Sequence, residues 1–182
     1  MILTGPEITR AVHDSEITLT PFDPAQVNPN SYNYRLSPTL KTITSPVSDP
    51  RAEPRVEAVE FGEDGLVLQP GIVYLGTTVE QIGSCRYVPS LIGRSSLGRL
   101  GLFLQISADL GQLGACHRWT LEIVATQPIR IYPRMIVGQV SFWVAVGAAM
   151  PYAGYYGNLD APAPCDPYAA EGRGAHREGV AA

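Results

Sequence analysis

The sequence predicts an all-β fold with minor helical content, in which short strands close into a barrel or a double sheet. Two observations carry this prediction. Short apolar runs rich in β-branched and aromatic residues follow one another from residue 65 to residue 146, each bounded by turn-forming residues. The 182 residues also include 18 glycines and 16 prolines, which supply frequent turns and leave little room for long helices. Many short strands of this kind are typical of barrels and double sheets rather than open sheets.

One helix is expected at the amino end of the chain. Thr4 stands where a helix cap would lie and Glu7 follows three residues later, which is the spacing of a capping box. Ile8, Val12 and Ile17 then mark an apolar side. The sequence therefore predicts a helix that begins near Thr4.

The rest of the chain is expected to form strands and turns. SYNYRLS at 31–37 alternates as a strand does, whereas DPRAEPRVEAVEFGEDG at 49–65 is expected to be a charged loop. Further strands are expected within five apolar stretches, residues 65–82, 86–93, 100–110, 119–132 and 135–146. We expect one β domain over residues 1–157. A tail rich in Gly, Ala and Pro follows over 158–182, and about its last fifteen residues are expected to be disordered.

Charge and cysteine content limit the partners. The net charge of −4 makes a nucleic-acid partner unexpected, and no apolar run approaches the length of a membrane span, so no membrane partner is expected either. Lys41 is the only lysine among 13 basic residues, so the rest are arginines, which suit bidentate contact with phosphate unless they only reflect composition bias. Three scattered cysteines favour a reducing, cytoplasmic location over a disulfide framework.

The stretch GRSSLGRLGL at 93–102 places four polar residues at the edge of an apolar region. We expect a strand, a glycine turn and a short helix with Ser95 or Ser96 at its N-cap. Arg94 and Arg99 could then aim at the same anion, most simply a phosphate at the helix N-terminus. The alternative is a capped helix whose arginines pair with surface carboxylates.

This stretch resembles a motif of the dCTP deaminase family, which is related to the trimeric dUTPases. The amino-terminal segment with PFDPAQVNPNSYNYRL also resembles that family, as do three later segments in the family's order: LQPGIVYLGTTVEQI, SADLGQLGACHRWTLEI and PIRIYPRMIVGQVSF. The resemblance covers residues 1 to about 157. It implies a dUTPase-like distorted β-barrel or jelly roll that assembles as a homotrimer with active sites between subunits.

The resemblance implies a hydrolytic deaminase that acts on a small cytosine nucleotide. Glu122 matches the catalytic general base and acid, and Ser95 and Arg99 match residues that polarise the attacking water and hold this glutamate. Burial between Leu121 and Ile123 is expected to raise the pKa of Glu122. Taken without the resemblance, a glutamate at this position in a strand most simply faces solvent.

The resemblance also implies the residues that hold the substrate. Arg94 and Ser96 would hold the phosphates. Ile106, Ser107 and Ala108 would contact the edge of the pyrimidine. Gln112 would lie at the sugar, and Tyr152 would lie near the phosphates. No metal is expected at the reacting carbon, and Mg²⁺ would accompany the nucleotide phosphates. Two fragments suggest zinc, HRE at 176–178 and PC at 164–165, but their order is reversed relative to zinc deaminases and a second cysteine is missing. Cys116 and His117 offer two adjacent ligands without a second pair.

The sequence departs from the family pattern mainly beside the expected sugar site. Gln112 replaces an aspartate, Ala115 an aromatic residue and His117 a glycine, while Gly111 replaces a branched residue and is expected to leave more room beside the sugar. Discrimination against a 2′-hydroxyl is then expected to relax, which admits CTP or CMP beside dCTP, the default substrate.

Two other departures concern the phosphates and the backbone. The family's carboxy-terminal clamp is shortened to YYGN at 155–158 without a lysine, and Arg134 replaces a glycine. Three functions therefore stay open: a deaminase, a dUTPase-type pyrophosphohydrolase, or a nucleotide-binding trimer without catalysis. The pyrophosphohydrolase is disfavoured because Gln112 stands where hydrolysis at the phosphates needs an aspartate. The non-catalytic trimer is disfavoured because Ser95, Arg99 and Glu122 occur together.

Overall fold

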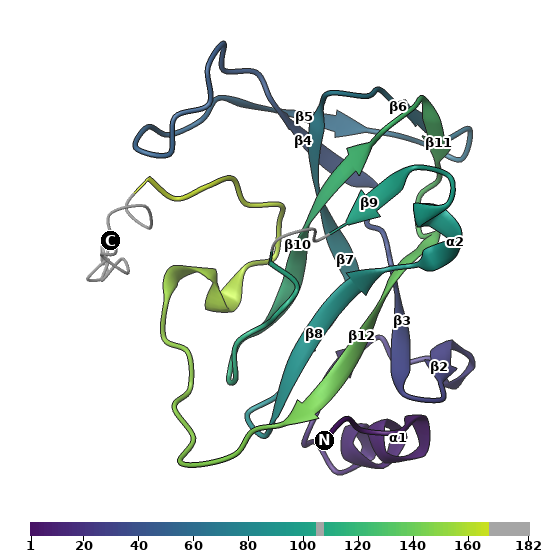
Figure 1. Ribbon diagram of the computed structural model, residues 1–182, viewed down its shortest axis with the longest axis vertical. Coiled ribbons are helices and arrows are strands. Elements are labelled where there is room, and N and C mark those ends of the chain that lie inside the picture. The colour runs from purple at the N-terminus through teal and green to yellow at the C-terminus, as the bar shows by residue number, and fades with distance from the viewer. Residues whose placement is uncertain (105–107, 168–182) are drawn as a thin grey trace.

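A computed structural model describes residues 1–104 and 108–167, and it confirms the predicted all-β fold with minor helical content (Figure 1). Three short helices precede or interrupt the described strands, and a fourth follows them. The elements in chain order are α1 (Gly5–His13), β1 (Thr18–Thr20), η1 (Pro24–Gln26), β2 (Val27–Asn28), β3 (Ser31–Arg35), β4 (Thr39–Ile43), β5 (Val56–Glu60), β6 (Leu66–Leu68), β7 (Val73–Gly83), β8 (Tyr87–Gly93), α2 (Ser95–Gly98), β9 (Leu102–Leu104), β10 (Cys116–Ala125), β11 (Ile129–Ile131), β12 (Ile136–Val144) and η2 (Tyr155–Asn158). No helix in the described ranges is long and apolar enough to cross a membrane.

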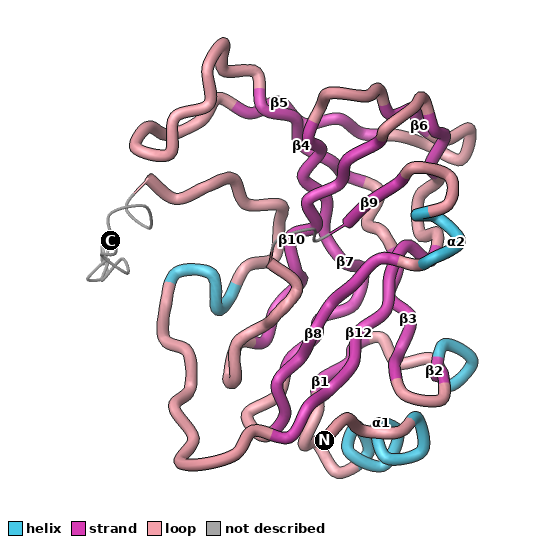
Figure 2. Tube along the Cα trace, in the orientation of Figure 1, coloured by secondary structure: helices cyan, strands magenta, loops and turns pink. Residues whose placement is uncertain are grey.

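The described strands form two main sheets and one small pair (Figure 2). One sheet runs in the order β5-β4-β7-β10-β9, with β1 also paired to β7, and the other runs β2-β3-β12-β8. The small pair joins β6 and β11. One hydrophobic core draws on both main sheets, for example on Tyr34 and Val140 from one sheet and on Leu121 and Ile123 from the other. Buried and outward residues alternate over much of β8 and over the later parts of β10 and β12, where the apolar periodicity predicted strands, whereas β7 is buried along most of its length.

The amino-terminal helix begins where the sequence predicted, but without the predicted capping box. Thr4 is the N-cap residue, yet its side chain makes no capping hydrogen bond. Glu7 instead accepts hydrogen bonds from the guanidinium of Arg10, which also pairs with Asp14 and Glu16. A charged cluster on one side of α1 therefore takes the carboxylate that the capping box would have used.

The segment predicted to be a charged loop contains a strand. β5 pairs antiparallel with β4 along its whole length, so that part of the prediction for residues 49–65 was wrong. β5 lies at the edge of its sheet, and Glu57 and Glu60 on it are exposed. Charged side chains are common on edge strands because they discourage pairing with another chain. Here the exposed glutamates made the segment resemble a charged loop, so the strand was not predicted from the sequence.

An irregularity in the β7–β10 pairing sets the position of the site. Arg118 pairs with Gln81, but two residues later Thr120 pairs with Thr77, so β7 carries two additional residues at this point. Thr78 bridges the irregularity, because its Oγ1 accepts a hydrogen bond from the backbone N–H of Trp119 at 3.0 Å. Such bulges turn side chains locally and occur often beside active sites. Beyond this point the odd-numbered side chains of β10 enter the core.

Candidate active site

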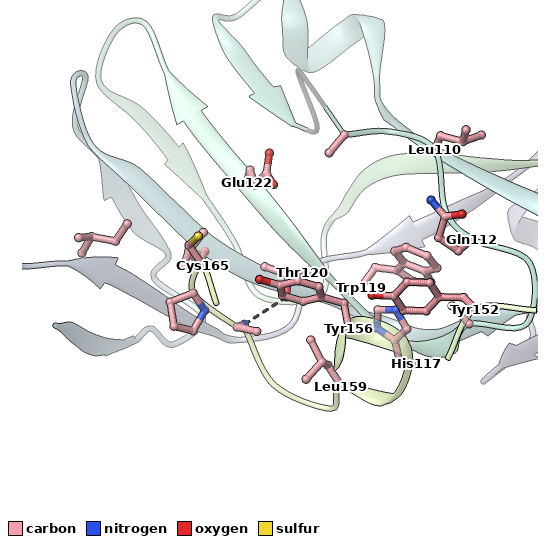
Figure 3. A pocket seen from close by; sticks show the side chains of 16 residues that line it. Leu110, Gln112, His117, Trp119, Thr120, Glu122, Tyr152, Tyr156, Leu159 and Cys165 are labelled. Atoms are coloured by element: carbon pink, nitrogen blue, oxygen red, sulfur yellow. Dashed lines mark hydrogen bonds between the residues drawn. The ribbon is translucent and has the colours of Figure 1, made fainter. Parts of the chain in front are cut away.

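Glu122 lies in the wall of a pocket of about 540 Å³ (Figure 3). Its backbone pairs with Leu75 of β7, and its side chain is half-buried. The neighbouring Leu121 and Ile123 point the other way into the core, which fixes the direction of the glutamate. The strand therefore directs this carboxylate into the pocket rather than toward open solvent.

The pocket gathers part of the residues that the resemblance implied. Ala108, Gln112 and Tyr152 line it together with Glu122, whereas Ile106 and Ser107 lie outside the described residues. The remaining lining residues are mostly apolar or aromatic: Ile43, Leu75, Leu110, Ala115, His117, Trp119, Thr120, Tyr156, Leu159, Ala163, Pro164 and Cys165. Its volume and its few polar groups suit a small ligand with a flat ring.

The segment after β12 closes one side of the pocket. Hydrogen bonds tie it to the barrel at four points: Tyr152 N–H to Leu113 O at 2.7 Å, Arg118 N–H to Leu159 O at 3.1 Å, Ala163 N–H to Thr120 Oγ1 at 3.1 Å and Lys41 Nζ to Pro162 O at 2.8 Å. The described part of the expected tail thus packs against β10 and β4. The single lysine of the chain anchors this segment.

The four polar residues of the GRSSLGRLGL stretch do not reach this pocket. β8 ends at Gly93, Arg94 takes the N-cap position, and Ser95 and Ser96 are the first residues of α2, so the prediction of a serine at the N-cap was wrong. Ser95, Ser96 and Arg99 are exposed, and Arg94 is half-buried. Figure 1 shows α2 on the side of the molecule away from the segment that closes the pocket. Within one chain these residues and Glu122 belong to different surfaces.

The surroundings of Gly111 differ from expectation. A Cβ atom at Gly111 would lie 2.6 Å from Cη2 of Trp119 and 2.7 Å from Cγ of Pro89. The indole of Trp119 therefore occupies the room that the missing side chain leaves, and the expected open space beside Gly111 is absent. The indole Nε1–H also donates to Ile82 O at 2.9 Å, which fixes the ring.

His117 packs on this indole and borders the pocket. The two ring centroids lie 4.3 Å apart with an interplanar angle of 32°, and 4% of His117 is exposed. Burial lowers the pKa of His117, while the contact of Nδ1 with Arg118 O and the charge of Asp160 act in the opposite direction. The net lowering keeps the imidazole neutral at pH 7.

Apart from Tyr152, sequence reasoning missed the aromatic residues of this pocket and the residues that the tail contributes to it. His117 was considered only as a departure from the family and as a zinc ligand, and Trp119 and Tyr156 carried no motif signal. Cys116 lines a different, smaller pocket from His117, because adjacent residues of a strand face opposite sides. Within residues 1–104 and 108–167 no three His, Cys, Asp or Glu side chains are grouped to hold a metal ion, and the HRE fragment at 176–178 lies outside them.

Similarity to known proteins points to one family. The sequence profile of the dCTP deaminase-like family matches residues 2–145. The chain is 44% identical over 142 residues to a protein of Hathewaya histolytica named "dCTP deaminase, dUMP-forming", which covers 78% of this chain and 82% of that protein. It is 42% identical over 147 residues to a protein of Rhodopirellula baltica named "dCTP deaminase", with 81% of this chain and 74% of that protein covered.

A solved structure shares the fold. The crystal structure of 2′-deoxycytidine 5′-triphosphate deaminase from Agrobacterium tumefaciens has a TM-score of 0.64 and 22% sequence identity to this chain. The match covers 79% of this chain and 48% of that chain, so this protein spans about half of the length of that structure. At this identity the likeness concerns the arrangement of the strands.

Proposed function

Because the chain belongs to the dCTP deaminase-like family, we propose that it is a hydrolase that deaminates a cytosine nucleotide, with dCTP as its substrate. The observation that supports this most directly is the position of Glu122 in the wall of a nucleotide-sized pocket, with Ala108 also in that wall. The chain is 40–44% identical to relatives named as dCTP deaminases over most of its length. A carboxylate that faces a largely apolar pocket is the group that this chemistry needs.

The proposed reaction joins one water to C4 of the cytosine and releases one ammonia. Glu122 takes a proton from water as the oxygen–C4 bond forms, and this proton passes to N3 of the ring. The proton of the new hydroxyl group then passes to the amine as the C4–N4 bond breaks. The products are one uracil nucleotide and one ammonia, and the glutamate ends in its starting state.

We propose that the active protein is a homotrimer with sites between subunits. Ser95, which begins α2, and Arg99, which directly follows α2, are exposed, and within the described residues no hydrogen bond or ion pair holds either side chain. They lie outside the pocket of their own chain, so a second copy is needed to bring them to Glu122. There they would polarise the water, while Arg94 and Ser96 would bind phosphate through charge-assisted hydrogen bonds.

In this proposal no metal acts at C4, and Mg²⁺ accompanies the triphosphate. The described residues that line the pocket fit an Mg²⁺ ion that arrives with the triphosphate. They include one carboxylate, that of Glu122, and no cluster of acidic side chains that would hold a resident ion. Mg²⁺ prefers phosphate oxygens and water with few protein ligands. Tyr152, which lines the pocket, would contact the phosphate end.

A second function is favoured by the names of several relatives, which are called dUMP-forming. Such an enzyme would also release pyrophosphate, which requires a group that activates water at the phosphates. Gln112 lines the pocket where the sequence pattern has an aspartate, and an amide does not accept the proton of an attacking water. We therefore propose dUTP as the product and keep dUMP as the alternative.

The experiment that tests these proposals measures two products from the same reaction. Purified protein is incubated with dCTP, CTP, dCMP, CMP or dUTP, and ammonia and pyrophosphate are measured. Ammonia without pyrophosphate from dCTP supports the proposal, and equal amounts of both support the dUMP-forming alternative. Absence of ammonia from all four cytosine nucleotides contradicts deamination.

A further inference from the structure

We propose that His117 determines substrate specificity by accepting a hydrogen bond from a hydroxyl group on the sugar of the bound nucleotide. The inference rests on the proposed function, because it assumes that the pocket beside Glu122 holds a cytosine nucleotide. It assigns a role to a residue at which the family pattern has a glycine.

The contact of His117 with the backbone defines its tautomer. Nδ1 lies 2.9 Å from the carbonyl oxygen of Arg118, and a carbonyl oxygen can only accept. The proton of the imidazole must therefore sit on Nδ1. Because burial keeps the ring neutral, Nε2 has a lone pair and acts as an acceptor.

This Nε2 atom has no partner within the described residues. The only fully buried side-chain nitrogen or oxygen there that lacks a hydrogen bond is Oε1 of Gln26, so Nε2 of the buried His117 is not sealed inside the protein. One side of the ring packs on Trp119, and the ring borders the pocket. The unpaired acceptor is therefore open to the pocket, where a ligand donor could satisfy it.

The chemistry of a cytosine nucleotide identifies that donor. Its hydrogen-bond donors are the amine on C4 and the sugar hydroxyls, whereas the phosphates of the ionised nucleotide only accept. The amine must lie at Glu122 for the reaction to occur, so it is not available to His117. A hydroxyl of the sugar is the donor that remains.

The spacing along β10 agrees with this assignment. His117 and Glu122 are five residues apart on one strand, which is roughly 16 Å between their Cα atoms before the side chains reach inward. Figure 3 shows His117, Trp119, Gln112 and Tyr152 toward one end of the pocket and Glu122 away from them. A nucleotide with its base at Glu122 would extend its sugar toward His117.

The test combines one substitution with substrate analogues. His117→Phe keeps a ring that can stack on Trp119 and removes the acceptor, and Cys116→Ser, on the opposite face of the same strand, is the matched control. Dissociation constants are measured by calorimetry for dCTP, CTP, 3′-deoxy-CTP and 2′,3′-dideoxy-CTP, with Glu122→Gln in every protein to prevent turnover. Melting curves verify that each variant is folded.

We expect His117→Phe to weaken binding of the analogues that carry the contacted hydroxyl about tenfold, the size of one hydrogen bond, and to leave dideoxy-CTP binding unchanged. Loss for dCTP but not 3′-deoxy-CTP assigns the 3′-hydroxyl, and loss for 3′-deoxy-CTP but not dCTP assigns the 2′-hydroxyl. Equal loss for all four nucleotides, or loss for none, overturns the inference and leaves the proposed function intact.

The protein that carries Glu122→Gln alone, with His117 intact, gives a second measurement that does not depend on the folding of His117→Phe. In this protein dideoxy-CTP is expected to bind about tenfold more weakly than the analogue that binds best. Equal affinity for all four nucleotides overturns the inference. Failure of every cytosine nucleotide to bind overturns the proposed function as well.

Discussion

Arg35 and Glu80 form an ion pair that joins the two main sheets. Nε of Arg35 lies 2.7 Å from Oε1 of Glu80, and the backbone N–H of Arg35 donates to Oε2 at 2.9 Å. Glu80 is fully buried and lies on β7 within the irregular stretch opposite Trp119, whereas Arg35 ends β3 in the other sheet. The pair thus holds the barrel closed next to the pocket.

Removing the charge of Glu80 is expected to destabilise the protein. Glu80→Gln leaves Arg35 without its counter-charge, and we expect a loss of about 3 kcal/mol in the free energy of unfolding. Urea denaturation followed by circular dichroism measures it. Glu7→Gln, which removes a carboxylate from the exposed cluster on α1, is the control and should cost clearly less. Equal losses in both variants would show that burial of the Arg35–Glu80 pair has no special importance.

Replacing the carboxylate in the pocket is expected to remove deamination without loss of structure. In Glu122→Gln the amide cannot take a proton from water, so kcat for ammonia release from dCTP should fall at least about a hundredfold. The melting temperature should stay close to that of the wild type. Glu57→Gln on the exposed edge strand is the matched control and should keep full activity. A Glu122→Gln protein as active as the wild type would place the chemistry elsewhere.

Mixing two inactive variants tests whether sites form between copies. Arg99→Ala and Glu122→Gln are each expected to be inactive in dCTP deamination. If one subunit supplies Glu122 and another supplies Arg99, subunits unfolded together and refolded as an equal mixture should regain about a quarter of the wild-type activity, because a quarter of the sites combine two intact halves. Activity that stays at the level of the separate variants contradicts a shared site.

The burial of His117 makes stability depend on pH. Burial lowers the pKa of His117 in the folded state below its ordinary value of 6.5, so below that value the unfolded chain binds more protons than the folded one. Folding stability should therefore fall as the pH drops from 7 through and below 6.5. In His117→Phe this part of the pH dependence should be absent. Thermal melts at several pH values measure the stability of the wild type and of His117→Phe. Identical dependence of the melting temperature on pH in the two proteins would contradict the prediction.

The backbone at Arg134 offers a stabilising substitution. Its φ of 60° lies in the left-handed region, which costs about 1–2 kcal/mol for a residue with a side chain. Arg134→Gly relieves this strain but makes the unfolded chain more flexible, so the expected gain in unfolding free energy is about 1 kcal/mol. Arg130→Gly on β11 is the comparison, and it should destabilise the protein because its backbone is extended. Loss of stability in Arg134→Gly would show that its side chain stabilises more than its conformation costs.

The sequence alone determined the fold class, most of the strands and the family. Apolar alternation depends on neighbours two residues apart, so it is visible in stretches such as 31–37 and 135–146 without knowledge of the tertiary structure. The position of Glu122 in a strand between core residues was equally local. The edge strand β5 escaped prediction because its exposed charges do not reflect burial.

Only the tertiary structure decided what surrounds Glu122. The indole of Trp119 fills the space beside Gly111, and the segment held by Lys41 closes the pocket, although these groups are far apart in the sequence. The irregular pairing of β7 with β10 also changes which side chains of β10 face the pocket. Burial, side-chain direction and the free acceptor of His117 all depend on such long-range contacts, and local sequence patterns carry no information about them.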